Sequence, residues 1–302
     1  MSGDDRVKQA CAYLRMLLLR PGEYRTAWQR RAMHAAAGEI DYAAVAHVLH
    51  QAGGAEHDDA ALVDTVRNAL EGTDLSAETL GRFVDAFGLR RRQATRLMEL
   101  MRGSESVRVI SGEVRMPENL PDTLAPAGYE TLSLHESHVL GPDGLPAEHQ
   151  TIQVIRSTVD GLTSLPYRFD TDELVVEVAR GGRVGDRVYR LADTLYAVDI
   201  MLTQPLARGQ TALMQYRTTF FYKSPPRPEF RRGVLSSTKD LTVWVTFHRD
   251  RLPRTVWVAR WDAWDHARVI EQEPVELDNE MSVHRRFGSV QRAIVGFHWE
   301  WD

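Results

Sequence analysis

Histidine and acidic side chains gather in one stretch of the sequence, where a metal site is the first chemistry to consider. His135, Glu136 and His138 lie within four residues, and His149 follows eleven residues later. On a strand, the odd spacing of His135 and His138 places their rings on opposite faces. A two-histidine metal site also needs a third ligand and an open position. We therefore predict no metal site here.

Other residues that could take part in binding or catalysis also have simpler interpretations. One acidic group could bind calcium through its carboxylate oxygens: Asp170, Asp172 and Glu173. A turn followed by the start of a strand is the better interpretation of this segment. The chain has no Gly-x-Ser-x-Gly elbow, phosphate-binding loop, dinucleotide-binding Gly-x-Gly-x-x-Gly or His-Glu-x-x-His motif. Cys11 lies in an apolar helical pattern, where a thiol behaves as a small hydrophobe. We predict no catalytic residues and no cofactor, so an enzyme is the least supported function class.

Composition and charge narrow the remaining function classes. The chain has 302 residues, of which 43% are hydrophobic and 26% charged, so it is globular and long enough for two domains. Its net charge is −5, and the first 104 residues are neutral. This balance argues against a sequence-independent, high-affinity DNA binder. A single cysteine, no membrane-length apolar run and no signal peptide predict a cytoplasmic protein without membrane contact.

The first third of the chain has helical periodicity. Apolar residues recur at spacings of three and four, and glycine, proline or capping residues punctuate them. Pro21 and Gly22 follow the first helix, Gly38 is a predicted cap for the second, and Asp41 precedes the third. Six short helices are predicted, near 10–18, 23–37, 42–52, 58–70, 76–87 and 94–101.

From Tyr129 onward, apolar residues recur with a period of two. In the segment 241–248, Leu, Val, Val and Phe alternate with Thr, Trp, Thr and His, as in a strand with two different faces. Further strands are predicted at 107–110, 129–140, 148–158, 173–180, 194–203, 211–223, 254–262 and 291–301. Turn residues separate several of them, and no helical pattern intervenes, which favours an antiparallel sandwich or barrel.

These patterns predict an α+β chain with two domains. An all-helical, helix-turn-helix-like domain is expected over 1–104, and an antiparallel β-sandwich or barrel domain over 129–302. A connector at 105–128 contains Pro117, Pro121 and Pro126.

The helical part resembles a known family. Residues 60–103 contain Gly72, a Ser76-led helix with Thr79-Leu80 and Phe83, and an Ala-Phe-Gly-Leu bend at 86–89. This arrangement resembles the third to fifth helices of the Cro/repressor-type (XRE) helix-turn-helix family. Segments such as the one ending Gly-Phe-His-Trp-Glu-Trp-Asp are similar to C-terminal regions of actinobacterial helix-turn-helix proteins, whose function is unsettled.

The resemblance implies that helix 58–70 enters the major groove of DNA. Its polar candidates for base contact are Thr65, Arg67 and Asn68, because Arg suits guanine and Asn suits adenine. The turn before this helix is longer than the motif requires, and the helix begins among Glu56, Asp58 and Asp59. The alternative is a compact helical bundle whose acidic first turn complements its own dipole.

A run of arginines offers a second contact. Arg90, Arg91 and Arg92, followed by Arg96, form the only basic cluster. They suit a DNA backbone or an acidic partner, and the alternative is a solvated helix start. Their position in a first turn is not favoured by the helix dipole.

Six of the seven tryptophans fall in the last sixty residues. Most such rings build the core of a β-domain. Trp244 and Trp257 are opposite in phase to neighbouring valines, so we predict a partner or ligand surface that includes Trp244, Trp257 and Trp261.

Two functions follow. The first is a bacterial DNA-binding transcriptional regulator, expected to be a homodimer, whose β-domain senses a ligand or dimerises. The second is an adaptor in which both domains bind proteins and the helices never contact DNA. A positive face and a steep salt dependence of DNA affinity distinguish the first from the second.

Overall fold

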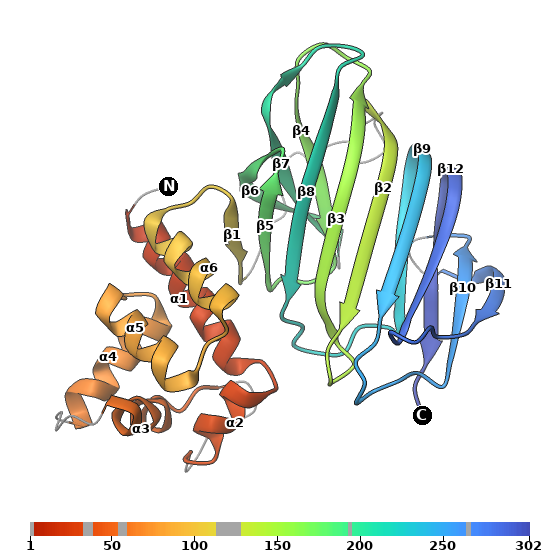
Figure 1. Ribbon diagram of the computed structural model, residues 1–302. Coiled ribbons are helices and arrows are strands. Elements are labelled where there is room, and N and C mark those ends of the chain that lie inside the picture. Colours follow the sequence, from red (N-terminus) through yellow and green to blue (C-terminus); the bar gives the residue numbers. More distant parts are fainter. Residues whose placement is uncertain (1–2, 33–38, 54–58, 113–127, 193–194, 264–266) are drawn as a thin grey trace. The chain divides into compact units, whose positions relative to one another are not determined.

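The computed structural model divides into two compact units. It describes residues 3–32, 39–53, 59–112, 128–192, 195–263 and 267–302. The helical unit is Met1–Val109 and the strand unit is Ile110–Asp302 (Figure 1). Most of the predicted connector, including its three prolines, lies outside the described residues, as does Gly38.

The described part of the helical unit contains six helices with well-defined ends. They are α1 (Gly3–Leu19), α2 (Glu23–Gln29), α3 (Tyr42–Gly53), α4 (Asp59–Glu71), α5 (Ala77–Phe87) and α6 (Arg91–Arg102). Asp41 and Ser76 each accept a hydrogen bond at 3.0 Å from the backbone N–H three residues on, and so cap α3 and α5. Gly88 and Gly103 end α5 and α6 with φ of 59° and 79°, which disfavours side chains. Helix α2 is shorter than the predicted 23–37.

The helices enclose an apolar core. Helix α1 packs on α4 and α6, and α3 packs on α4 and α5. Trp28 is fully buried and donates its indole N–H to the Leu18 carbonyl at 2.9 Å. Phe83 and Phe87 are 0% and 8% exposed with ring centroids 6.2 Å apart, as expected for apolar residues four apart on the inward face of a helix. No described helix is long and apolar enough to cross a membrane.

The described part of the strand unit forms one large and one small sheet. Its strands are β2 (Tyr129–Leu140), β3 (Pro146–Ser157), β4 (Leu162–Phe169), β5 (Leu174–Arg180), β6 (Gly182–Ala192), β7 (Leu195–Leu206), β8 (Thr211–Phe220), β9 (Glu229–Thr246), β10 (Thr255–Trp261), β11 (Val269–Val275) and β12 (Ser282–Glu300). The short β1 (Val107–Ile110) precedes them at the unit boundary.

The predicted fold class, an all-helical domain followed by an antiparallel sandwich or barrel, is wrong. The large sheet is mixed: it runs β5-β8-β3-β2-β9-β12-β10-β11, and β2 pairs with β9 in parallel. Strands β4, β7 and β6 form a separate sheet. Alternation in the sequence locates strands and their faces, but it carries no information on partner or direction. The parallel pair joins segments about a hundred residues apart, which local patterns do not reveal.

Long strands β9 and β12 bend sharply. His138 on β2 has Val245 as its ladder partner on β9, yet its ring lies 4.8 Å from that of Phe230, fifteen residues earlier on the same strand. The pairing of β9 with β12 shifts register at three places between Arg286 and Ala293. Within this segment Gly288 and Arg292 have positive φ. Such bulges bend strands, so the first part of β9 folds back over the face of β2 and β3.

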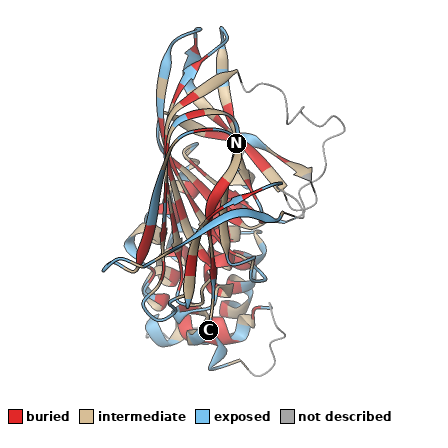
Figure 2. Ribbon diagram, turned by 90° about the vertical axis from the view of Figure 1, so that its right-hand side faces the viewer, coloured by how far each residue is buried: buried red, intermediate tan, exposed pale blue. Residues whose placement is uncertain are grey.

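Two apolar cores fill the strand unit, and a polar band lies between them. One core includes Tyr216 and Phe220 of β8 with residues of the small sheet, and the other includes Leu134 and Leu140 of β2. Burial alternates along β2 and β3, and Figure 2 shows buried and less buried stretches following one another along several strands. On the buried face between the two cores, several positions of β2, β3 and β8 are polar: Glu136, His138, His149, Thr151, Gln153 and Thr218.

Candidate functional site

Helix α4, which corresponds to the predicted recognition helix 58–70, has one buried and one exposed face. Its buried side chains are Leu62, Val66, Ala69 and Leu70. Thr65 is half-buried and bonds back to the Ala61 carbonyl at 2.9 Å, whereas Arg67 and Asn68 are exposed. The three predicted contact residues therefore do not share one fully exposed surface.

Neighbouring side chains engage the two exposed residues of α4. Arg67 Nη1 lies 3.0 Å from Asp64 Oδ1, and its guanidinium lies 5.7 Å from the centre of the Tyr42 ring on α3. Asn68 Oδ1 accepts a hydrogen bond from the Thr73 hydroxyl at 3.2 Å. Arg67 remains half-exposed, so it is the better placed of the two to reach another molecule.

The arginine run is divided by the start of α6. Arg90 caps the helix: its backbone N–H donates to Gln93 Oε1 at 3.0 Å, and its guanidinium pairs with Glu23 at 3.2 Å. Arg91 is exposed and Arg92 is half-buried. Arg96, expected to extend the basic cluster, is buried and donates to the Tyr13 hydroxyl at 3.3 Å. The exposed cations at this helix start are therefore Arg90 and Arg91.

The predicted tryptophan surface is only partly exposed. Trp244 is 43% exposed and stacks on His284, with ring centroids 4.7 Å apart. Its indole N–H donates to the Ser282 hydroxyl. Trp257 is half-buried and stacks on His298 at 4.8 Å. Trp261 is 4% exposed and adds to the interior, where we expected a surface ring. Trp264 lies outside the described residues.

A buried charged cluster, formed by Glu136, His149 and Arg232, occupies the polar band of the strand unit. Glu136 is 2% exposed, and one carboxylate oxygen lies 3.0 Å from Arg232 Nη1 and 3.5 Å from His149 Nε2. The other oxygen of Glu136 has no hydrogen-bond partner. Burial alone raises the pKa of Glu136, but Arg232 and His149 together hold the pKa below its usual value.

Three ring contacts surround the cluster. Phe230 stacks on His149 at 5.2 Å and lies 4.8 Å from His138, and the two imidazole rings are 5.7 Å apart. Burial, together with the neighbouring His149, holds the pKa of His138 well below 6.5. The site is packed with apolar rings and a guanidinium, and no group of three or more metal-ligand side chains occurs among the described residues.

The sequence contained part of this cluster. Residues 136 and 138 share a strand face because they are two apart, and His149 is the cross-strand partner of His138. The spacing of His135 and His138, on which the prediction of no metal site rests, does not concern the face that Glu136 and His138 share. Arg232 has no local signal, because only the bend of β9 carries it to Glu136.

The buried imidazole of His138 predicts a pH-dependent stability. An unfolded histidine has a pKa near 6.5, and that of folded His138 is lower. The unfolded chain therefore binds more protons below about pH 6.5, so stability is complete above that pH and falls as the pH decreases. Urea unfolding between about pH 7.5 and 5.5 measures the slope. H138F, which keeps a ring of similar size, is expected to flatten it; an unchanged slope contradicts the assignment.

Comparisons with known proteins identify no family for the chain. No protein-family model matches it, and neither does any curated protein. Among solved structures, a candidate protease from Parabacteroides distasonis is 13% identical, with a TM-score of 0.38 over 58% of this chain and 41% of its own. An M1 zinc metallopeptidase from Deinococcus radiodurans is 14% identical, with a TM-score of 0.28 over 59% and 44%. The chain spans less than half the length of these structures, and such TM-scores carry no functional argument.

Proposed function

We propose that the chain is a bacterial DNA-binding transcriptional regulator whose helical unit contacts DNA through α4. The observation that carries the proposal is the packing of α4. It follows α3 and packs on it, buries its apolar face and leaves Arg67 exposed. An amphipathic helix packed in this way on its predecessor is the arrangement that a helix-turn-helix presents to the major groove.

The ion pair on α4 does not prevent DNA contact. Asp64 and Arg67 are both substantially exposed, and an exposed pair of this kind contributes about 0–1 kcal/mol. A bidentate contact from arginine to guanine contributes about 1–3 kcal/mol of discrimination between bases. The free energy lost when Arg67 leaves Asp64 is therefore smaller than the free energy gained from a base contact.

Arg91 supports the proposal as a backbone contact. Its side chain is exposed in the first turn of α6. A cation that meets a phosphate adds affinity for every sequence alike, whereas a base contact adds it for one sequence. Arg67 and Arg91 thus have different expected roles.

The strand unit is assigned a sensing or dimerising role within the same proposal. Trp244 and His284 form an exposed stacked pair on neighbouring strands, β9 and β12. Exposed aromatic side chains are enriched at protein interfaces. A two-fold homodimer places two copies of α4 on successive half-sites, and a regulator of this kind acts in the cytoplasm.

Three substitutions test the proposal. R67A is expected to weaken binding to one selected DNA site by about 1–3 kcal/mol and to relax preference at one base pair. R91A is expected to weaken binding to all sequences alike. D64N removes a carboxylate that repels phosphates and is expected to strengthen binding. Gel-shift titrations of the full chain measure all three.

The adaptor function is the alternative outcome. If R67A, R91A and D64N all leave retention on DNA unchanged, the helices do not contact DNA. R82A is the matched control, because Arg82 is paired with Glu78 on α5, as Arg67 is paired with Asp64 on α4. Its DNA affinity is expected to equal that of the unmodified chain.

A further inference from the structure

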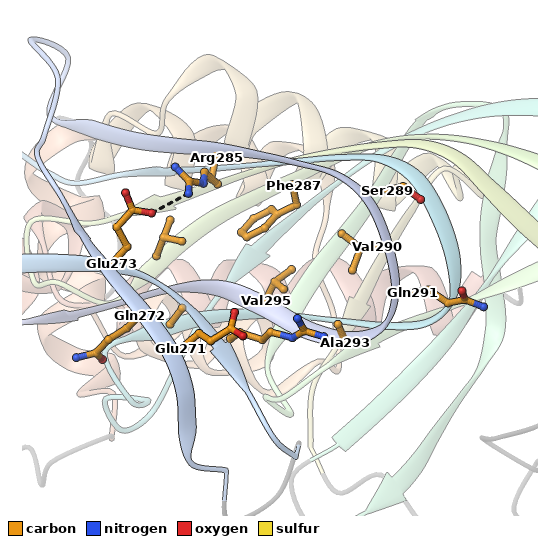
Figure 3. Close-up of a pocket in the computed structure, with 13 residues that line it drawn as sticks. Glu271, Gln272, Glu273, Arg285, Phe287, Ser289, Val290, Gln291, Ala293 and Val295 are labelled. Carbon is orange, nitrogen blue, oxygen red and sulfur yellow. Dashed lines mark hydrogen bonds and ion pairs between the residues drawn. The ribbon is translucent and has the colours of Figure 1, made fainter.

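A groove in the strand unit has the volume of a small-ligand site. It lies between β10, β11 and the bent part of β12, and has a volume of about 380 Å³ (Figure 3). Its apolar lining includes Val258, Phe287, Val290 and Val295. Val290 and Val295 belong to the second apolar core, and Phe287 packs against that core. The groove is therefore an opening onto the core, within the 300–1,000 Å³ range of ligand pockets.

Charged side chains line the groove, and one pair is already satisfied. Arg285 of β12 and Glu273 of β11 form an ion pair at 2.8 Å, which Figure 3 shows as a dashed line. These two charges neutralise each other and need no further partner.

A second pair of opposite charges is not joined. Arg260 of β10 and Glu271 of β11 are cross-strand partners, and both line the groove. Both side chains are exposed, and among the described residues neither makes an ion pair or side-chain hydrogen bond. Within the described part of the chain, the groove thus presents one unpaired cation and one unpaired anion next to each other, beside an apolar surface.

We propose that this groove binds a free apolar α-amino acid. Its carboxylate would accept hydrogen bonds from the Arg260 guanidinium, for which carboxylates are the natural bidentate partner. Its ammonium would donate to the Glu271 carboxylate. The two charges of an α-amino acid flank a single carbon, and cross-strand side chains start about 5 Å apart. The apolar side chain would lie against Phe287 and Val290.

Charge complementarity selects this ligand class over its relatives. An apolar acid leaves Glu271 unpaired beside its carboxylate, and an apolar amine leaves Arg260 unpaired beside its ammonium. Each therefore meets a like charge that the zwitterion neutralises. The site lies wholly within the strand unit, so the inference stands apart from the proposed DNA contact.

The test uses the full chain and three matched ligands: L-phenylalanine, 3-phenylpropanoate and phenethylamine. Ligand-observed NMR titrations are expected to give L-phenylalanine an affinity at least fivefold above either analogue. R260Q removes the carboxylate's partner and is expected to abolish the advantage over phenethylamine. E271Q removes the ammonium's partner and is expected to abolish the advantage over 3-phenylpropanoate.

R254Q is the matched control, because Arg254 is exposed just before β10 and does not line the groove. It is expected to keep the full preference for L-phenylalanine. Absence of L-phenylalanine binding, equal affinity for the three ligands, or equal losses with R254Q and R260Q would each overturn the proposal. Circular dichroism spectra of the variants verify that the strand unit remains folded.

Discussion

E136A is expected to destabilise the strand unit by about 3–5 kcal/mol. Glu136 is almost wholly buried, and its carboxylate is the partner of both Arg232 and His149. Removing the carboxylate leaves the Arg232 guanidinium, whose side chain is 30% exposed, without its partner beside the buried face of the sheet, which is more costly than losing the pair as a whole. The truncated side chain also leaves a cavity beside His149, whose Nε2 lies 3.5 Å from the carboxylate.

Guanidinium unfolding of the full chain, followed by tryptophan fluorescence, measures this loss. Six of the seven tryptophans lie in the strand unit, so the signal follows that unit. E130Q is the control on the same strand. Glu130 is more exposed, pairs with Arg156 at 3.1 Å and Lys239 at 3.2 Å, and is expected to contribute no more than about 1 kcal/mol. Equal effects of E136A and E130Q would show that the buried cluster has no special part in stability.

F83A is expected to destabilise the helical unit by about 3–5 kcal/mol. Phe83 is fully buried, and its ring stacks on that of Phe87. Its removal loses the transfer free energy of the ring and leaves a cavity that neighbouring helices cannot fully close. Far-ultraviolet circular dichroism during urea unfolding reports the loss, because all described helices are in this unit.

M98A provides the comparison for F83A. Met98 of α6 is 42% exposed, so truncation removes few buried contacts and is expected to change stability by less than about 1 kcal/mol. If F83A costs no more than M98A, then α5 does not pack in the phase that the structure shows.

The sequence predicted the helical unit better than the strand unit. Asp41, Ser76, Gly88 and Gly103 act through backbone groups within a few residues, so their effects on helix ends are visible locally. Strand pairing depends on distant segments. Strands β4, β6 and β11 were missed, and β11 is exposed along almost its whole length, so it lacks the alternation on which the prediction relied.

The candidate sites likewise include features that local sequence predicts and features that depend on distant segments. The exposure of Arg67 and Trp244 follows from periodicity within one element, and the structure places both at the surface. The burial of Trp261 depends on what covers its strand, and the pairing of Glu136 with Arg232 depends on the bend of β9. Long-range packing of this kind leaves no trace in local spacing.

The salt dependence of DNA binding tests the central claim most directly. The full chain is incubated with genomic fragments, and the affinity of the retained fragment is measured at about 50 mM and about 200 mM salt. Because arginine–phosphate contacts release counterions, the proposal predicts a decrease in affinity of about tenfold or more over this range. Retention of no fragment, or an affinity that does not change with salt, would contradict the regulator function and favour the protein-binding adaptor.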